Sequence, residues 1–132
     1  MLKKIFAIAI VALTVAGCST FQKVVDVAGA TVPAAVVIPA ANAFDILKAG
    51  ATSYGAYCIN QRKKVGSWPA ICSADTRRIV IKTVRSGTAA RNQLEMTIET
   101  GTPAAASVYN VMIAAIDGVK TTPAADPQFG GK

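Results

Sequence analysis

Apolar residues recur at helical spacing in the middle of the chain. Over residues 42–61 they are separated by steps of three or four, which places them on one face of a helix. Asn42 stands just before this stretch, and its side-chain oxygen can accept from the free backbone N–H groups of a first turn. We therefore predict a helix over 42–61 with Asn42 as its N-cap. Its apolar face consists of Phe44, Leu47, Ala51, Tyr54 and Cys58.

A second helix is indicated near the C-terminus by the residues that flank it. Thr102 is a suitable N-cap, Pro103 a suitable first helical residue, and Gly118 a residue just past the end. Residues 121–132 hold two Pro and two Gly and little that is apolar except Phe129, so we expect a disordered tail there. The predicted core face of the helix consists of Val108, Val111, Met112, Ala115 and Ile116.

Residues 75–99, between these two helices, carry mixed signals. Asp75 is a suitable cap, but Ile79-Val80-Ile81 is β-prone and Gly87 interrupts the pattern. We predict a helix here, with a hairpin that turns near Ser86-Gly87 as the alternative. The fold class is then mainly α, a small three-helix domain over 42–120. The imperfect helical stripe of this segment consists of Ile81, Val84, Thr88, Leu94 and Ile98.

Residues 18–41 form an Ala- and Val-rich segment that is broken by Pro33 and Pro39. We expect it to lie close to a membrane, with a helical turn or two followed by an extended Pro segment. A second membrane helix over 24–41 is the alternative, which the two prolines and Asp26 disfavour.

The N-terminus has the pattern of an export signal. Lys3 and Lys4 precede residues 5–16, which carry no charge. As a helix these twelve residues would span about 18 Å, less than the ~30 Å of a bilayer core. The pattern therefore predicts a cleaved secretory signal peptide. A permanent transmembrane anchor is the alternative.

The end of this run resembles the lipobox of bacterial lipoproteins. Val15-Ala16-Gly17-Cys18 places an aliphatic residue and two small residues before a Cys, although Val15 replaces the more usual Leu. The resemblance implies that signal peptidase II removes residues 1–17 and that Cys18 carries the lipid. Ser19, where Asp would retain the protein in the inner membrane, implies transfer to the outer membrane, facing the periplasm. Two or three acyl chains anchor a protein firmly without spanning the bilayer. Ordinary signal-peptidase cleavage after Gly17 is the alternative.

The cysteine count agrees with export. If Cys18 carries lipid, Cys58 and Cys72 remain as a pair in an oxidising compartment, where a disulfide is the expected outcome. Closing the intervening loop would stabilise the fold by about 3 kcal/mol. The alternatives are a metal pair, which lacks further soft ligands, and a redox-active pair, which lacks CxxC spacing.

Composition narrows the function classes. The chain has 132 residues, 52% of them hydrophobic, and no His. This length fits one domain, and the absence of His excludes Ser-His-Asp triads, HExxH zinc sites and Cys-His dyads. We expect no cofactor and no metal. Removal of residues 1–17 takes away Lys3 and Lys4 and no acid, so the formal net charge falls from +7 to +5.

The basic residues form two clusters on either side of the cysteine loop, and a disulfide would bring them to one end of the fold. Such clusters are usually solvated faces, but they are also candidate contacts. In the periplasm the partners would be anionic lipid, lipopolysaccharide or an acidic envelope protein, and not nucleic acid. Trp68, in the loop, is either an interfacial ring or a lid on the core. The candidate basic contact face consists of Arg62, Lys63, Lys64, Arg77, Arg78, Lys82 and Arg85.

The expected function is a non-catalytic structural or interaction module in the cell envelope, which Ala- and Gly-rich helix faces would allow to form an oligomer. One alternative is a phage- or prophage-encoded envelope lipoprotein in superinfection exclusion or lysis. Another is a small cell-wall hydrolase that uses Glu95 and Glu99, which lie four residues apart on one helix face. Two exposed carboxylates at this spacing are ordinarily just solvated.

Overall fold

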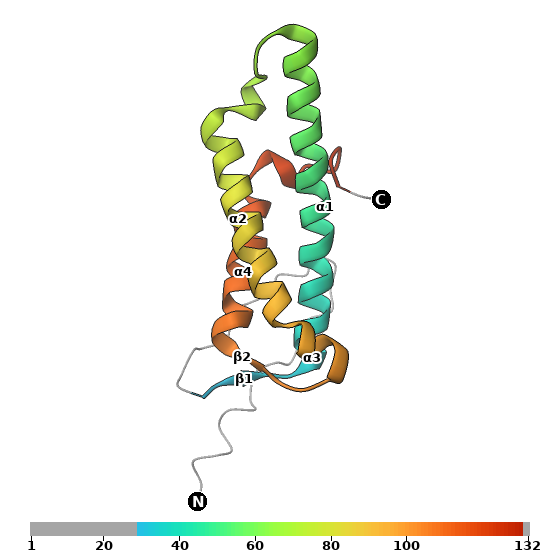
Figure 1. Cartoon of the computed structure of the whole chain (residues 1–132), viewed down its shortest axis with the longest axis vertical. Coiled ribbons are helices and arrows are strands. Elements are labelled where there is room, and N and C mark those ends of the chain that lie inside the picture. The colour runs from blue at the N-terminus through green and yellow to red at the C-terminus, as the bar shows by residue number, and fades with distance from the viewer. Residues whose placement is uncertain (1–28, 131–132) are drawn as a thin grey trace, which may run out of the picture.

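Three long helices run side by side in a bundle. A computed structural model of the chain describes residues 29–130, which form four α-helices and two short strands. The long helices are α1 (Ala34–Val65), α2 (Ala74–Gln93) and α4 (Ala106–Lys120), and the short α3 (Glu95–Thr100) follows α2 (Figure 1). The predicted mainly α fold with three principal helices is confirmed.

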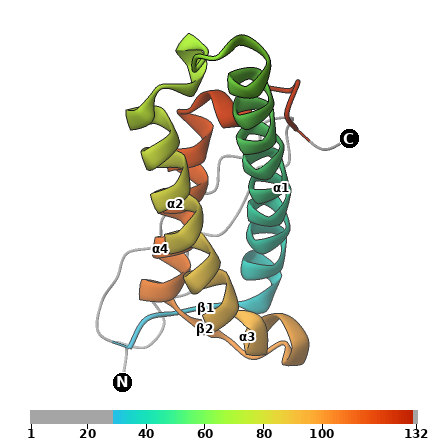
Figure 2. The same cartoon turned by 45° about the horizontal axis from the view of Figure 1, so that its top comes forward.

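The two ends of the bundle are built differently. At the base, β1 (Thr31–Val32) pairs antiparallel with β2 (Ala104–Ala105), and α3 lies beside this pair (Figure 2). At the opposite end, which we call the tip, a loop that contains the 3₁₀ helix η1 (Ala70–Cys72) joins α1 to α2. Because α1 has 32 residues, the tip and the base lie about 48 Å apart.

The core consists of two clusters along the bundle axis. The cluster nearer the base packs side chains of α1 and α4, among them Phe44, Met112 and Ile116, against Leu94. The cluster nearer the tip contains Tyr54 of α1 and the end of α4. Leu47 packs against both clusters and joins them.

Gly87 allows the three long helices to approach one another. A Cβ atom at this position would lie 2.7 Å from the Cβ atom of Ala115 and would overlap the ring of Phe44. The glycine that interrupts the sequence pattern of α2 is therefore required where α2 meets α1 and α4.

The start of α1 differs from the sequence prediction. The helix begins at Ala34, so the predicted boundary between 18–41 and 42–120, the extended Pro segment and the Asn42 N-cap are wrong. Pro39 lies inside the helix, where it removes one backbone hydrogen bond. Burial outweighs this cost, because Val37, Ala40, Ala41 and Phe44 continue the apolar face across the proline.

α1 is also long and apolar enough, by length and composition, to cross a membrane. Its most apolar 18-residue window has a mean hydropathy of 1.3 and is 33% buried in the bundle. The core helix of a soluble protein passes the same test, and α1 places Phe44 and Tyr54 in the core. The alternative span over 24–41 begins outside the described residues.

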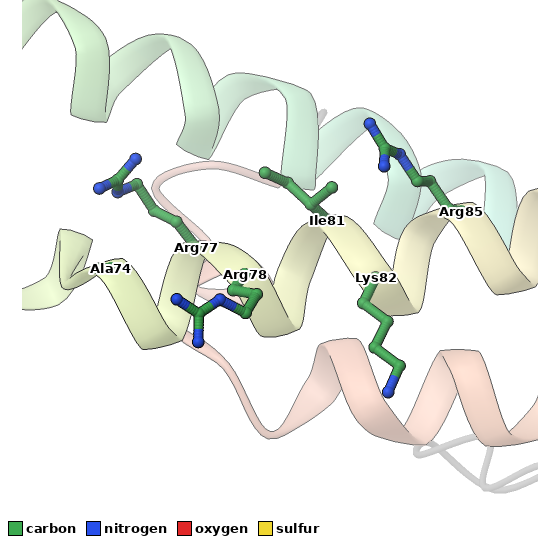
Figure 3. A pocket seen from close by; sticks show the side chains of 6 residues that line it. All are labelled: Ala74, Arg77, Arg78, Ile81, Lys82 and Arg85. Atoms are coloured by element: carbon green, nitrogen blue, oxygen red, sulfur yellow. The ribbon is translucent and has the colours of Figure 1, made fainter.

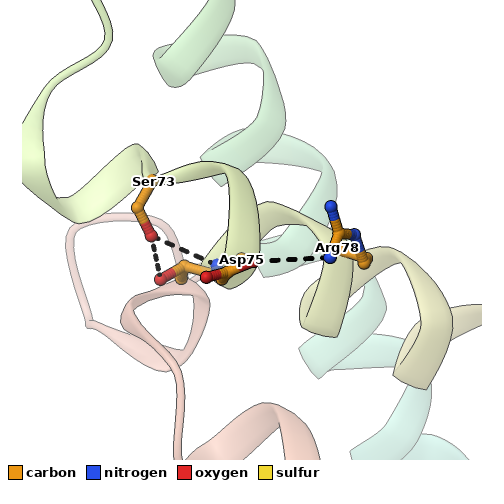
Figure 4. Close-up of polar contacts among 4 residues, drawn as sticks. Ser73, Asp75 and Arg78 are labelled. Atoms are coloured by element: carbon orange, nitrogen blue, oxygen red, sulfur yellow. Dashed lines mark hydrogen bonds and ion pairs between the residues drawn. The ribbon is translucent and has the colours of Figure 1, made fainter.

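α2 begins two residues earlier than a cap at Asp75 would place it. The N-cap is Ser73, whose hydroxyl accepts from the backbone N–H of Thr76 at 3.2 Å, and Asp75 lies in the first turn (Figure 4). The predicted helix over 75–99 is confirmed as helical, but a turn at Leu94 divides it into α2 and α3. The alternative hairpin is not formed.

α4 starts later and ends later than predicted. Ala104–Ala105 pair with β1, so the helix starts at Ala106, and Thr102 and Pro103 precede it. Gly118 lies within the helix, which continues to Lys120. Val111, which we placed in the core face, is 44% exposed, whereas Tyr109 is buried.

The C-terminal segment folds back onto α1. The expected disorder of 121–132 is wrong for residues 121–130, which include the 3₁₀ helix η2 (Pro123–Ala125). Phe129 is 5% exposed and its ring lies 5.5 Å from that of Tyr54 and 5.3 Å from that of Tyr57. The burial of Phe129 and Ala124 ties this Pro- and Gly-rich segment to the bundle.

Candidate interaction surface

A disulfide joins the end of α1 to the segment before α2. Cys58 and Cys72 are bonded, with their Cα atoms 5.7 Å apart and both side chains fully buried. The predicted pairing is therefore confirmed. Beside it, the hydroxyl of Tyr54 donates to the carbonyl of Ile71 at 2.5 Å. Burial raises the pKa of Tyr54, and the positive charge of Arg77 opposes this shift in part.

Two guanidinium groups lie over the ring of Trp68 at the tip. The Cζ atom of Arg77 is 3.6 Å from the centroid of the Trp68 ring, and that of Arg62 is 4.8 Å from it. Arg77 is fixed further because its Nε donates to the carbonyl of Cys72 at 3.0 Å. We call these three residues the arginine–tryptophan stack. Trp68 also packs against the core cluster nearer the tip, so it is both a lid on that cluster and a support for two cations.

The outward side of α2 carries the second group of cations. It forms a shallow, open hollow on the surface, and Figure 3 shows its charged side chains spreading on either side of Ile81. At 100° per residue this side is opposite to Val80, Gly87 and Ala90, which are buried. We call the exposed residues Arg78, Lys82 and Arg85 the basic face. Arg77 lines its edge but belongs to the arginine–tryptophan stack.

The charge of the basic face is only slightly compensated. Asp75 is the acid on α2, and its carboxylate lies 3.4 Å from Arg78 (Figure 4). Both side chains are more than three-quarters exposed, at 86% and 76%, so the pair contributes little. Ile81, at the centre of the face, is 50% exposed. A hydrophobic side chain ringed by cations suits contact with an acidic surface.

The structure divides the predicted basic cluster into two parts. Arg62, Lys63 and Lys64 occupy the last turn of α1, where cations also complement the helix dipole. Arg77 joins Arg62 through Trp68, whereas Arg85 lies eight residues further along α2, about 12 Å away. The sequence identified all of these cations but not the stack, because only the folded loop brings Trp68 against two arginines.

The paired carboxylates are at the other end of the bundle. Glu95 forms an ion pair with Arg91, which also pairs with Asp45 at 3.3 Å. This bridge between α1, α2 and α3 was not predicted. Asp45 and Arg91 are 46 residues apart in the sequence, and only folding brings them together. Glu99 is exposed on α3. Within residues 29–130, no group of three or more His, Cys, Asp or Glu is placed to hold a metal ion.

The fold and surface define a disulfide-bonded helical bundle with a basic tip and a basic helix face. No family model matches the chain, and no curated protein or solved structure matches it either. The predicted signal peptide and Cys18, on which the resemblance to bacterial lipoproteins rests, lie outside the described residues.

Proposed function

We propose that the protein is a lipid-anchored envelope lipoprotein, facing the periplasm from the outer membrane, that binds an acidic envelope protein without catalysis. The lipobox at Val15-Ala16-Gly17-Cys18 supports the anchor, since Cys18 would carry it. The Cys58–Cys72 bond supports export, since disulfides persist in oxidising compartments.

The observation that carries the interaction is the basic face of α2. Its cations point away from the core around the half-exposed Ile81, with Asp75 as the single acid of the helix. An acidic partner would gain charge complementarity, which steers encounter and selects partners. Ile81 would supply an apolar contact at the centre of the interface, where binding energy is concentrated. The open, shallow shape of the face suits a protein surface better than an enclosed small molecule.

The test is crosslinking of the anchored protein in its own envelope. A photoreactive residue in place of Ile81 should form a crosslinked complex with a defined partner. The Arg78→Glu, Lys82→Glu, Arg85→Glu variant should lose that crosslinked product. The matched control, Lys48→Glu with Lys120→Glu, reverses exposed cations outside both the basic face and the tip, and it is compared with Lys82→Glu, Arg85→Glu, which changes the net charge equally. The control should keep the product. An unchanged product in the basic-face variants, or equal loss in the control, would contradict the proposal.

The anchor has its own test. Mass spectrometry of the native protein should find a chain that begins at a diacylated Cys18, and the Cys18→Ser variant should lack acylation. A native chain with Met1 intact would contradict the envelope location.

A further inference from the structure

The tip is rich in cations and lacks acidic residues, and it is a surface separate from the basic face. No acidic residue occurs from Arg62 to Ala74, and the tip holds four cations: Arg62, Lys63, Lys64 and Arg77. Among the described residues, none of these four forms an ion pair with a carboxylate. The tip therefore presents uncompensated positive charge at the end of the bundle.

Exposed apolar side chains lie among these cations. Val65 is 71% exposed at the end of α1, and Ile71 is 36% exposed in η1. Trp68, in the loop between them, is partly exposed. Aliphatic, indole and cationic side chains are thus combined at one projecting end, a combination typical of protein segments that enter a membrane interface.

The arginine–tryptophan stack holds two guanidinium groups ready for an anion. Stacking on Trp68 restrains Arg62 and Arg77, and the bond from Nε of Arg77 to Cys72 leaves the two Nη groups of Arg77 for another acceptor. Guanidinium groups match phosphate oxygens in a two-pronged geometry. Restraint before binding lowers the ordering cost of that contact.

We propose that the tip inserts into the interfacial region of an anionic phospholipid bilayer. Its cations would bind headgroup phosphates, while Val65, Trp68 and Ile71 would enter the layer beneath them. A small soluble phosphate would account for the arginines but not for the exposed Val65 and Ile71. An acidic protein partner would account for the cations but would not require an indole at the boundary between polar and apolar surroundings.

This contact would be a second attachment, distinct from the proposed lipid anchor. The chain leads toward Cys18 from the base, through β1, whereas the tip lies at the far end of α1 in both views (Figures 1 and 2). The inference shares the envelope location with the proposed function but uses other residues, so the two can fail separately.

Trp68 is the only Trp of the chain, so its fluorescence reports on the tip alone. The full mature protein, purified with its anchor, is reconstituted into phosphatidylcholine vesicles with or without phosphatidylglycerol. We expect a blue shift of Trp emission and quenching by bromine-labelled acyl chains only with phosphatidylglycerol. High salt should abolish both, since it screens the charges. Absence of quenching with phosphatidylglycerol, or equal quenching without it, would overturn the proposal.

Two variants and one control separate the contributions. Lys63→Gln with Lys64→Gln should lower the affinity of the tip for phosphatidylglycerol vesicles by about five-fold for each cation removed. Val65→Ser should reduce quenching at unchanged charge. Lys82→Gln with Arg85→Gln, which removes the same charge from the basic face, should leave quenching unchanged. Equal effects of tip and control variants would overturn the role of the tip.

Soluble anions distinguish a bilayer from a phosphate site. Inorganic phosphate and glycerophosphoglycerol, at millimolar concentration and constant ionic strength, should leave the quenching in place. If either displaces the tip, the site binds a free phosphate and the bilayer proposal is wrong. Circular dichroism and the intact disulfide serve to verify the fold of every variant, and the crosslink at Ile81 tests the proposed function independently.

Discussion

Arg77 is held over Trp68 with its guanidinium carbon 3.6 Å from the ring centroid, while its Nε donates to the carbonyl of Cys72. One side chain of α2 thereby fixes both the loop and the residue that forms the disulfide with α1. The loop at the tip is therefore tied to both α1 and α2, which gives the tip a defined surface for a contact.

Arg77→Lys should destabilise the fold by about 1 kcal/mol, because an ammonium group can neither stack as a plane nor reproduce the Nε hydrogen bond. The measurement is the urea dependence of unfolding. Arg78→Lys is the matched control, since Arg78 is exposed and its ion pair with Asp75 is weak. Equal losses in the two variants would contradict a structural role for the stack.

Reduction of the Cys58–Cys72 bond should lower the free energy of unfolding by about 3 kcal/mol, as the chain-entropy estimate for a loop of this length gives. The effect is measured by urea unfolding with and without a reducing agent. The Cys58→Ala, Cys72→Ala variant should unfold like the reduced protein and should not respond to reductant. A response of that variant would show that the reductant acts elsewhere.

Two glycine substitutions should have opposite effects. Gly87→Ala should destabilise by about 2 kcal/mol, because the added Cβ would overlap Phe44 and crowd Ala115. Gly55→Ala should stabilise by about 0.5–1 kcal/mol, because its Cβ would meet nothing within 4 Å and alanine favours the helix. Thermal unfolding of both variants checks the pair. A stable Gly87→Ala protein would show that the helices pack differently there.

Phe129→Ala should destabilise by about 3 kcal/mol, since it empties the space beside Tyr54 and Tyr57. Gln128→Ala, at an exposed neighbour, should change stability by less than about 0.5 kcal/mol. Limited proteolysis of the first variant should also cut within residues 121–130 faster. Unchanged stability and cleavage would mean that the C-terminal segment does not pack on α1.

Stability should fall as the pH rises above about 10. Burial raises the pKa of both Tyr54 and Tyr109 above the ordinary value of 10.0, so the folded state holds these protons more tightly than the unfolded state. The contribution is complete below the unfolded pKa and is lost as the pH rises through the folded pKa. Tyr54→Phe should make this decline shallower in urea unfolding measured at several pH values, and an unchanged slope would contradict the assignment.

The positions of the helices and much of their buried faces could be predicted from the sequence. The stripe Phe44, Tyr54 and Cys58 lies buried as predicted, because a period of 3.6 puts such residues on one face whatever that face meets. The helix ends could not be read in the same way. Asn42 and Thr102 have the chemistry of caps but are not used, because Val37 extends the buried face before Asn42 and strand pairing at Ala104 delays the next helix.

The sequence predicted one basic contact face. In the structure its cations are divided between the basic face of α2 and the tip. Sequence spacing placed Arg78, Lys82 and Arg85 on one face of α2, which the structure confirms. It could not place Arg62 near Arg77, since their separation depends on the path of the loop that carries Trp68.

The amino-acid sequence by itself determined the helical class, the pairing of Cys58 with Cys72 and the positive charge around them, because these depend on local periodicity, on counting and on composition. Only the tertiary structure decided that α1 continues through Pro39, that Phe129 orders the C-terminal segment and that Trp68 joins two arginines. Each of these depends on burial against residues distant in the chain, and the free energy of that burial exceeds the local preferences that a sequence pattern records.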